Sequence, residues 1–258
     1  MQLKKLLFGL IIISGLCIVI TEKDYTSEMK ELESILNENA KLAEERNNID
    51  KNAEANTTEE NENSKEADKT DSDEQKKSNI NNVDDAIDEE KLAEKVKQLP
   101  VVGVGDSVML AAVDGLYKVF PNGYFDGKVS RSMIGGEEVL TNLANEGKLG
   151  NIVILALANN SDYFEWRIDR IMNVVGDRQI YWITAVLADD PEFNEKFRGY
   201  ASKHPNIHIV EWEEKSRGHS EYFYGDGIHV KGDGIDAYAN TVYEKIYEDY
   251  KNGILKLD

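Results

Sequence analysis

The sequence contains a single cysteine, Cys17, among its 258 residues, so the chain cannot form an intrachain disulfide. Its four histidines lie outside any HExxH motif and have no cysteine partners, which argues against a metal site. Basic residues are outnumbered by acidic ones, with 30 Lys and Arg against 49 Asp and Glu, which gives a formal net charge of −19. Binding to phosphates requires clustered basic side chains, and the sequence has no basic stripe. We therefore expect no metal, no other cofactor and no nucleic-acid partner.

Residues 21–100 lack glycine, tryptophan and phenylalanine, and they carry 24 acidic side chains against 12 basic ones. Within 47–82 almost nothing is apolar, so this part cannot bury enough surface to offset the entropy of the chain. Apolar residues recur at helical spacing over Met29–Ala40, which predicts a short helix or a coiled-coil stalk, and a second helix is predicted over Asp84–Gln98. We expect residues 21–99 to be an acidic, largely disordered tether with short helices.

The longest uncharged apolar run is Leu6–Ile20, which has 15 residues, follows Lys4 and Lys5, and precedes acidic residues. This charge pattern predicts that the N-terminus stays inside and that the remainder is exported. As a helix the run is about 22 Å long, shorter than a ~30 Å bilayer core, and no small-x-small cleavage site follows it. An uncleaved anchor, a cleaved signal peptide and a buried core segment all remain open. We prefer a signal anchor or transmembrane segment over residues 1–20, which predicts a single-pass cell-membrane protein with an extracytoplasmic domain.

From Val101 onward, apolar strand patterns alternate with amphipathic helix patterns. The predicted strands are Val101–Val104, Gly123–Phe125, Ile152–Ala158, Ile180–Thr184 and Ile207–Val210. The predicted helices are Ser107–Phe120, Gly136–Glu146, Phe164–Val175, Glu192–His204 and Ile235–Tyr250. Near-continuous apolar strands separated by helices favour a parallel sheet that is covered on both faces. We expect one α/β domain over 100–258, a three-layer sandwich with a five-stranded parallel sheet in the flavodoxin-like order.

Ser107 directly follows the first strand pattern and begins a helix pattern, which predicts a hydroxyl at the C-terminal edge of the sheet, where α/β folds bind ligands. A serine is a weak nucleophile unless a base activates it and a further group orients that base. His229 supplies an imidazole, and Asp226, three residues earlier, can orient the ring. Taken singly, the serine motif is also explained by a turn and the histidine by a structural role. Together they predict Ser107 as nucleophile, His229 as base and Asp226 as its orienting carboxylate.

Acyl transfer also requires N–H donors that stabilise a developing oxyanion. Asn159, which follows the third predicted strand, offers a side-chain donor, and the backbone N–H groups of Ser107 and Ser130 complete the predicted pocket. Asn159 and its neighbour are equally explained as a cap of the next helix. Weaker predictions concern contacts to substrate, for which packing or a solvated loop is an equally simple explanation. They are Arg131, Asn160, Tyr163 and His219.

These motifs resemble the SGNH (GDSL-like) hydrolase superfamily through Gly105-Asp106-Ser107, Asn159 and Asp226-x-x-His229. Over residues 100–247 the chain is most similar to the extracellular catalytic domain of peptidoglycan O-acetyltransferases. The stretches that carry this similarity are Gly105–Met109, Phe120–Asn122, Asp126–Val129 and Gly218–Phe223. The chain departs from the family at two of its sequence blocks. Ser130 stands where the family has glycine, and Leu157-Ala158-Asn159-Asn160 replaces Gly-Thr-Asn-Gly.

The resemblance implies a serine-linked acetyl-enzyme that transfers O-acetyl groups to or from cell-wall glycan. Family members usually carry a multi-helix membrane acyltransferase before this domain, whereas this sequence has at most one membrane segment. Either a separate membrane acyltransferase supplies acetyl groups, or water is the acceptor and the protein is a carbohydrate or peptidoglycan O-acetyl esterase. A non-catalytic envelope module that binds glycan is the alternative from another functional class.

Overall fold

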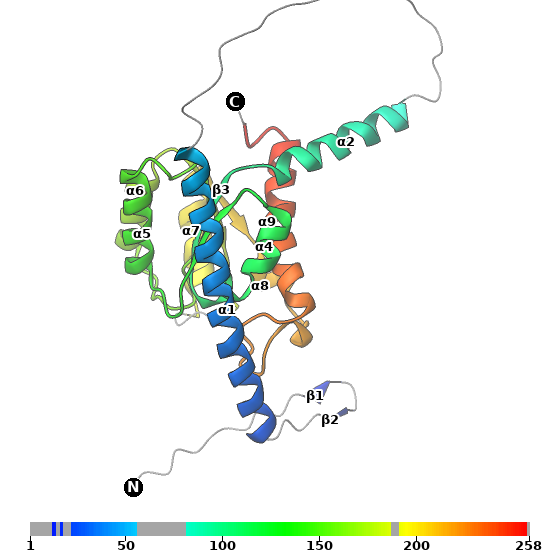
Figure 1. Cartoon of the computed structure of the whole chain (residues 1–258), viewed down its shortest axis with the longest axis vertical. Coiled ribbons are helices and arrows are strands. Elements are labelled where there is room, and N and C mark those ends of the chain that lie inside the picture. Colours follow the sequence, from blue (N-terminus) through cyan, green and yellow to red (C-terminus); the bar gives the residue numbers. More distant parts are fainter. Residues whose placement is uncertain (1–11, 14–15, 18–21, 56–80, 187–190, 257–258) are drawn as a thin grey trace, which may run out of the picture.

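The computed structural model describes residues 12–13, 16–17, 22–55, 81–186 and 191–256, and the side chains of 24–48, 89–186 and 191–256 (Figure 1). In chain order the elements are β1 (Ile12–Ile13), β2 (Leu16–Cys17), α1 (Glu22–Ala55), α2 (Asn81–Lys97), β3 (Val101–Gly105), α3 (Ser107–Ala111), α4 (Val113–Val119), β4 (Tyr124–Gly127), α5 (Met133–Asn145), β5 (Ile152–Ala156), α6 (Glu165–Val175), β6 (Gln179–Ile183), α7 (Phe193–Ala201), β7 (Ile207–Val210), α8 (Trp212–Lys215), the 3₁₀ turn η1 (Ser220–Tyr222) and α9 (Asp233–Lys251).

The predicted anchor over residues 1–20 falls outside the described residues, apart from β1 and β2, which pair with each other as antiparallel strands. Among the helices that the structure describes, none is both long enough and apolar enough to cross a lipid bilayer.

The central sheet is parallel throughout, with the strand order β4-β3-β5-β6-β7. This confirms the predicted α/β fold with a five-stranded, flavodoxin-like sheet. From β3 the chain passes to β4 on one side and then to β5 on the other side, where Gly103 is in register with both Phe125 and Ile154. The strand order therefore reverses at β3, and ligands bind at the carboxyl ends of the strands beside such a switch point. Ser107 lies two residues beyond the end of β3.

Alternate strand residues pack into two separate cores on the two faces of the sheet. Val102 and Val104 of β3 pack with the side chains of α5, α6 and α7, whereas Val101 packs on the opposite face with those of α4 and α9. All five residues of β3 and of β5 are buried. Successive residues of a strand point to opposite faces, so a strand that is covered on both faces must be apolar throughout. This explains the near-continuous apolar runs in the sequence.

The predicted helix Ser107–Phe120 is divided into α3 and α4 at Ala112. This residue has φ −91° and ψ 1°, and its N–H donates to the carbonyl groups of Val108 and Met109. β4 also extends to Gly127, beyond the predicted strand end at Phe125. A Cβ atom at Gly127 would lie 2.9 Å from the Cα of Leu110, so glycine permits the close approach of β4 and α3.

The structure differs most from expectation in the predicted tether over residues 21–99. Residues 22–55 form one long helix, α1, that lies along the domain (Figure 1). Leu32 and Ala43 of α1 are buried, and the Asn47 side chain bonds both the N–H and the carbonyl of Phe125 on the edge strand β4. The few apolar residues of α1 repeat with a helical period, which predicts a helix. They do not indicate which surface of the domain the helix packs against. Residues 56–80, within the predicted disordered part, lie outside the described residues.

Helix α2 matches the second helix predicted for this region and packs against α9. Val96 of α2 is fully buried, and the hydroxyl of Tyr243 donates a 3.1 Å hydrogen bond to the carbonyl of Ala93. Two segments that precede Val101 in sequence therefore pack on the domain through defined contacts.

Candidate active site

Ser107 is the first residue of α3, at the point where the chain leaves β3. Asp106 caps this helix, because its Oδ1 accepts a 2.9 Å hydrogen bond from the N–H of Val108. The turn from strand to helix is tight, and a Cβ atom at Gly105 would lie 2.6 Å from the Cβ of Met109. Glycine therefore allows β3 and α3 to meet closely enough to place Ser107 at the edge of the sheet.

Asp226 and His229 lie on one short loop between η1 and α9. Phe223 and Val230 form an antiparallel bridge at its base, and the N–H of Tyr224 donates to the carbonyl of His229 at 2.9 Å. Gly227 at the tip has φ +69°, a conformation that glycine adopts without strain. The loop therefore turns back on itself and presents both side chains on the same side.

The three predicted catalytic residues are in direct contact. His229 Nε2 lies 2.8 Å from Ser107 Oγ, and His229 Nδ1 lies 2.7 Å from Asp226 Oδ2. The other oxygen of Asp226 accepts the backbone N–H groups of Ile228 at 2.9 Å and His229 at 3.1 Å. These distances are those of a nucleophile, a base and an orienting carboxylate within hydrogen-bonding reach of one another.

The electrostatics of the loop keep Asp226 ionised. Burial acts to raise its pKa, but hydrogen bonds from the His229 ring and from the N–H groups of Ile228 and His229 outweigh burial and lower the pKa below its ordinary value. Ionised Asp226 accepts a hydrogen bond from Nδ1–H of His229, which leaves Nε2 free to accept the proton of Ser107.

Two of the predicted oxyanion donors are backbone N–H groups. Neither the N–H of Ser107 nor that of Ser130 bonds to another residue in the described parts of the chain. Ser130 has φ +57°, and no other non-glycine residue that the structure describes has a positive φ. The serine thus occupies a left-handed conformation at the position where the resembling family has glycine. Ser130 therefore holds a backbone conformation that glycine adopts without strain.

Asn159, the third predicted oxyanion donor, is held by a residue that the sequence reasoning missed. Its Nδ2 donates a 2.8 Å hydrogen bond to Oδ2 of Asp106, which leaves the second amide N–H for a ligand. The carboxyl group of Asp106 is fully buried. Burial raises the pKa of Asp106, against the opposing hydrogen bonds from Asn159 and the Val108 N–H. The position of Asp106 next to Ser107 is the one sequence feature that points to it. Its hydrogen bond to Asn159 is evident only from the structure.

Arg131, predicted to contact substrate, has a structural position instead. Its side chain is only 5% exposed, and the guanidinium donates to the carbonyl groups of Gly105 and Asp126 and to the Asp126 carboxylate. These bonds tie the loop that carries Ser130 to the ends of β3 and β4. Burial and three acceptors turn the guanidinium into the protein rather than toward a ligand.

The three other predicted substrate contacts lie in different surroundings. The side-chain nitrogen of Asn160 is buried without a hydrogen-bond partner among the described residues. Tyr163 packs edge-on against Phe193. His219 is exposed, stacks on Tyr222, and pairs through Nδ1 with Glu221 at 2.8 Å. No hydrogen bond joins the side chain of Asn160 or His219 to Ser107 or His229 among the described residues, and the assignment of all three as substrate contacts stays a prediction.

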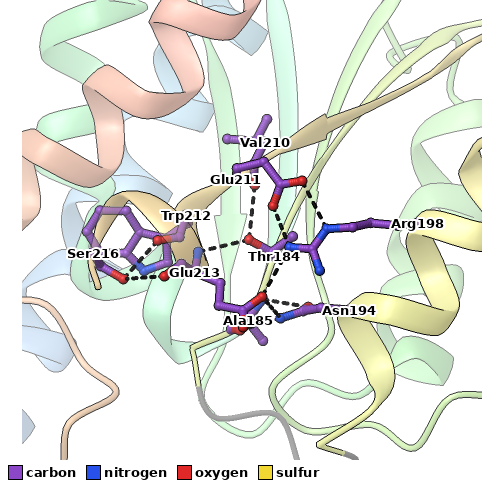
Figure 2. Close-up of polar contacts among 9 residues, drawn as sticks. All are labelled: Thr184, Ala185, Asn194, Arg198, Val210, Glu211, Trp212, Glu213 and Ser216. Carbon is purple, nitrogen blue, oxygen red and sulfur yellow. Dashed lines mark hydrogen bonds and ion pairs between the residues drawn. The ribbon is translucent and has the colours of Figure 1, made fainter. Parts of the chain in front are cut away.

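A groove of about 380 Å³ lies along residues 213–223, which precede the loop that carries Asp226 and His229. Its lining is Val186, Glu213, Ser216, Arg217, Gly218, His219, Ser220 and Phe223. Figure 2 shows the polar contacts that brace its wall at the ends of β6 and β7. Thr184 Oγ1 accepts the N–H of Glu213 at 2.9 Å, and Asn194 bonds both the N–H and the carbonyl of Ala185. The wall is therefore fixed by hydrogen bonds before any ligand binds.

Comparison with known proteins gives a consistent relationship. No model of a known protein family matches the chain. The chain is similar to O-acetyltransferase OatA of Staphylococcus aureus strain NCTC 8325 / PS 47, with 29% identity over 152 residues, 58% of this chain and 25% of that protein. A putative O-acetyltransferase of S. aureus strain MSSA476 is 27% identical over 146 residues, 55% of this chain and 24% of its own length. The chain spans about a quarter of the length of these curated relatives.

Among solved structures, the C-terminal catalytic domain of Streptococcus pneumoniae peptidoglycan O-acetyltransferase A, with a methylsulfonyl adduct, has the same fold. The TM-score is 0.51 at 21% identity, over 60% of this chain and 94% of that domain. The chain is therefore similar in sequence to O-acetyltransferases and shares the fold of a solved O-acetyltransferase catalytic domain. The predicted similarity to O-acetyltransferase catalytic domains is thereby confirmed. In the described domain the motifs that contain Ser107, Ser130 and Asn159 all lie at the carboxyl edge of the sheet, after β3, β4 and β5 respectively.

Proposed function

We propose that this protein is a serine-dependent acyl-ester enzyme that forms an acetyl-enzyme on Ser107 and moves O-acetyl groups to or from cell-wall glycan. The observation that carries the proposal is the continuous contact from Ser107 Oγ through the His229 ring to Asp226. The similarity to O-acetyltransferases over more than half of the chain supports acetyl as the group that is transferred.

The first half of the reaction forms the acetyl-enzyme. His229 Nε2 takes the proton of Ser107 as Oγ attacks the carbonyl carbon of the acetyl ester, and Asp226 stabilises the imidazolium. The N–H groups of Ser107 and Ser130 and the free amide N–H of Asn159 donate to the oxyanion of the tetrahedral intermediate. The intermediate collapses when the alkoxide of the leaving alcohol takes the proton from His229. The acetyl group then remains bonded to Ser107.

The second half transfers the acetyl group to an acceptor hydroxyl, with His229 again acting as base. A glycan hydroxyl gives a transferase, and the groove beside the loop supplies a surface of polar and aromatic side chains for such an acceptor. Water gives an esterase. The 18% exposure of the His229 side chain favours this second candidate, because water can reach the base.

The experiment uses the purified chain with a chromogenic acetyl ester, with and without chitooligosaccharide. We expect acetate-ester cleavage that Ser107→Ala abolishes, and acetylated oligosaccharide as a product. Release of acetate with no acetylated sugar would assign the esterase. Equal rates for the wild type and Ser107→Ala would leave a non-catalytic glycan-binding module as the remaining alternative.

We further propose that residues 1–20 anchor the protein in the cell membrane with the enzyme domain outside, and that a separate membrane acyltransferase supplies acetyl groups. Support comes from the sequence alone, in Lys4 and Lys5 before an apolar run that ends at Ile20. Membrane fractions of cells that produce the full chain should retain it after alkaline carbonate extraction, whereas deletion of residues 1–20 should release it. Release of the full chain by carbonate would refute the anchor.

A further inference from the structure

The Glu28 carboxylate of helix α1 contacts the loop Gly225–Lys231, which carries Asp226 and His229. Glu28 Oε2 accepts the backbone N–H of Gly225 at 3.0 Å, and Glu28 Oε1 pairs with Lys231 Nζ at 2.7 Å. Gly225 immediately precedes Asp226, and Lys231 follows His229 by two residues. A single side chain, separated from the loop by 197 and 203 positions in sequence, therefore bonds both ends of the segment that carries the base and its orienting group.

The rest of α1 is fixed on the same side of the domain. Asn39 Nδ2 donates to the carbonyl groups of Leu110 and Ala111, which lie at the end of α3, the helix that begins with Ser107. Further along α1, Asn47 bonds the edge strand β4. Because a helix is rigid over these few turns, anchoring it at α3 and β4 also sets where Glu28 stands. The helix thus joins the element that bears the nucleophile to the loop that bears the base.

The contact leaves little space for the loop to shift. A Cβ atom at Gly225 would lie 2.9 Å from Glu28 Oε2 and 3.2 Å from Tyr25 Cδ2, so the first turns of α1 lie directly against the loop backbone. The side chains of Glu28 and Lys231 are 29% and 34% exposed, which places the pair at the edge of the interface rather than in the core. Exposed pairs contribute little to folding stability. The Glu28–Lys231 pair therefore affects the position of the Gly225–Lys231 loop more than the stability of the fold.

We propose that Glu28 is a positioning residue of this enzyme, which holds the Gly225–Lys231 loop so that His229 Nε2 stays within hydrogen-bonding distance of Ser107 Oγ. The inference rests on the proposed acyl-ester activity and adds to it an N-terminal helix that is part of the working active site. Small displacements of a reacting group lower the rate steeply, with losses of about 10²-fold for about 1 Å. Loss of one of several loop contacts should give a smaller effect.

The test compares kcat and KM for a soluble acetyl ester in the full chain carrying Glu28→Ala, Glu28→Gln or Glu33→Ala. We expect Glu28→Ala to lower kcat about tenfold with KM unchanged, since the loop geometry and not the ester contacts are altered. Glu28→Gln should lose less, because its amide oxygen still accepts the Gly225 N–H. Glu33 is exposed on the same helix and makes no hydrogen bond or ion pair through its side chain with another described residue, so Glu33→Ala should match the wild type.

A second variant perturbs the same contact from the other side. Gly225→Ala places a methyl group against Glu28 and should lower kcat to a similar extent without removing any charge. The inference is overturned if Glu28→Ala has the kcat of Glu33→Ala, or if its loss appears only as a raised KM or as a lower melting temperature. Failure of the wild type to cleave the ester would overturn the proposed function, and this inference with it. An active wild type with unchanged Glu28 variants overturns this inference alone.

Discussion

Replacing Asp226 by asparagine should inactivate the enzyme by reversing the His229 tautomer while the loop stays folded. Asp226 Oδ1 accepts the N–H groups of Ile228 and His229, and Oδ2 faces His229 Nδ1 at 2.7 Å. In Asp226→Asn only the amide oxygen can accept these two N–H groups, so the amide nitrogen takes the place of Oδ2. A donor then faces Nδ1, which must lose its proton to accept it. The ring proton moves to Nε2, opposite Ser107 Oγ.

The structure sets the size of the effect. The reversed amide orientation would break two backbone hydrogen bonds, at a cost of about 1–3 kcal/mol for about 0.5–1.5 kcal/mol each. The orientation with the amide nitrogen facing His229 Nδ1 is therefore the more stable one. A protonated Nε2 cannot take the proton of Ser107. In serine enzymes with this arrangement the corresponding substitution lowers kcat about 10⁴-fold, equivalent to about 5.5 kcal/mol in activation free energy. The retained backbone bonds predict a nearly unchanged melting temperature.

The assay measures kcat and KM on a chromogenic acetyl ester, with Ser107→Ala as the background. Asp233→Asn is the matched control, since Asp233 is an exposed aspartate at the start of α9, just beyond the same loop. KM should change little. A kcat for Asp226→Asn within about tenfold of the wild type would refute the assignment of Asp226 as the group that sets the tautomer.

Three further outcomes follow from the site. Asp106→Asn keeps the helix cap but turns an amide nitrogen toward Asn159 Nδ2. On the same ester, kcat should therefore fall about 10²–10³-fold. An unchanged kcat would contradict the assignment of Asn159 as an oxyanion donor. Ser130→Gly removes a left-handed serine and should raise the unfolding free energy by about 1 kcal/mol in urea titrations with activity retained; a loss of stability would contradict strain at this φ of +57°. Despite burial, hydrogen bonds lower the folded-state pKa of Asp226, so its contribution to stability is present above pH 3.8 and is lost as the pH falls through that lower pKa. Urea titrations from about pH 6 down to about pH 2 should therefore show a steeper loss for the wild type than for Asp226→Asn, and parallel curves would contradict the lowered pKa.

Much of the domain was predictable because its signals are local. Each strand is a short apolar run, and in a parallel sheet the groups that follow such runs meet at one edge. Ser107 follows β3, Asn159 follows the third strand of the domain, and Asp226 and His229 share one loop, so the site could be assembled without coordinates. The break at Ala112 was not predictable, since the apolar period continues through it and only the backbone angles change.

The docking of α1 could not be derived from the sequence, for a physical reason. Its anchors are Glu28, Asn39 and Asn47, which are polar residues that also occur throughout solvated helices. Nothing in their spacing reveals that their partners lie some 70 to 200 positions away in the chain. Arg131 illustrates the same limit, because a loop arginine looks exposed until Asp126 and the carbonyl groups around it are placed. Long-range polar contacts have no periodic signature.

Asp106 and Asp226 each use one carboxyl oxygen to bond the backbone and the other to bond a side chain of the site. Asp106 gives one oxygen to the backbone N–H of Val108 and the other to Asn159. Asp226 gives one oxygen to two backbone N–H groups and the other to His229. In each case one carboxyl oxygen accepts backbone N–H and the other bonds the side chain of Asn159 or His229. The proposed oxyanion donor Asn159 and the proposed base His229 are therefore oriented before substrate binds, and less reorganisation is needed when charge develops. It follows that an aspartate-to-asparagine change at either position should reverse one hydrogen bond in a known direction, without unfolding the loop that carries it.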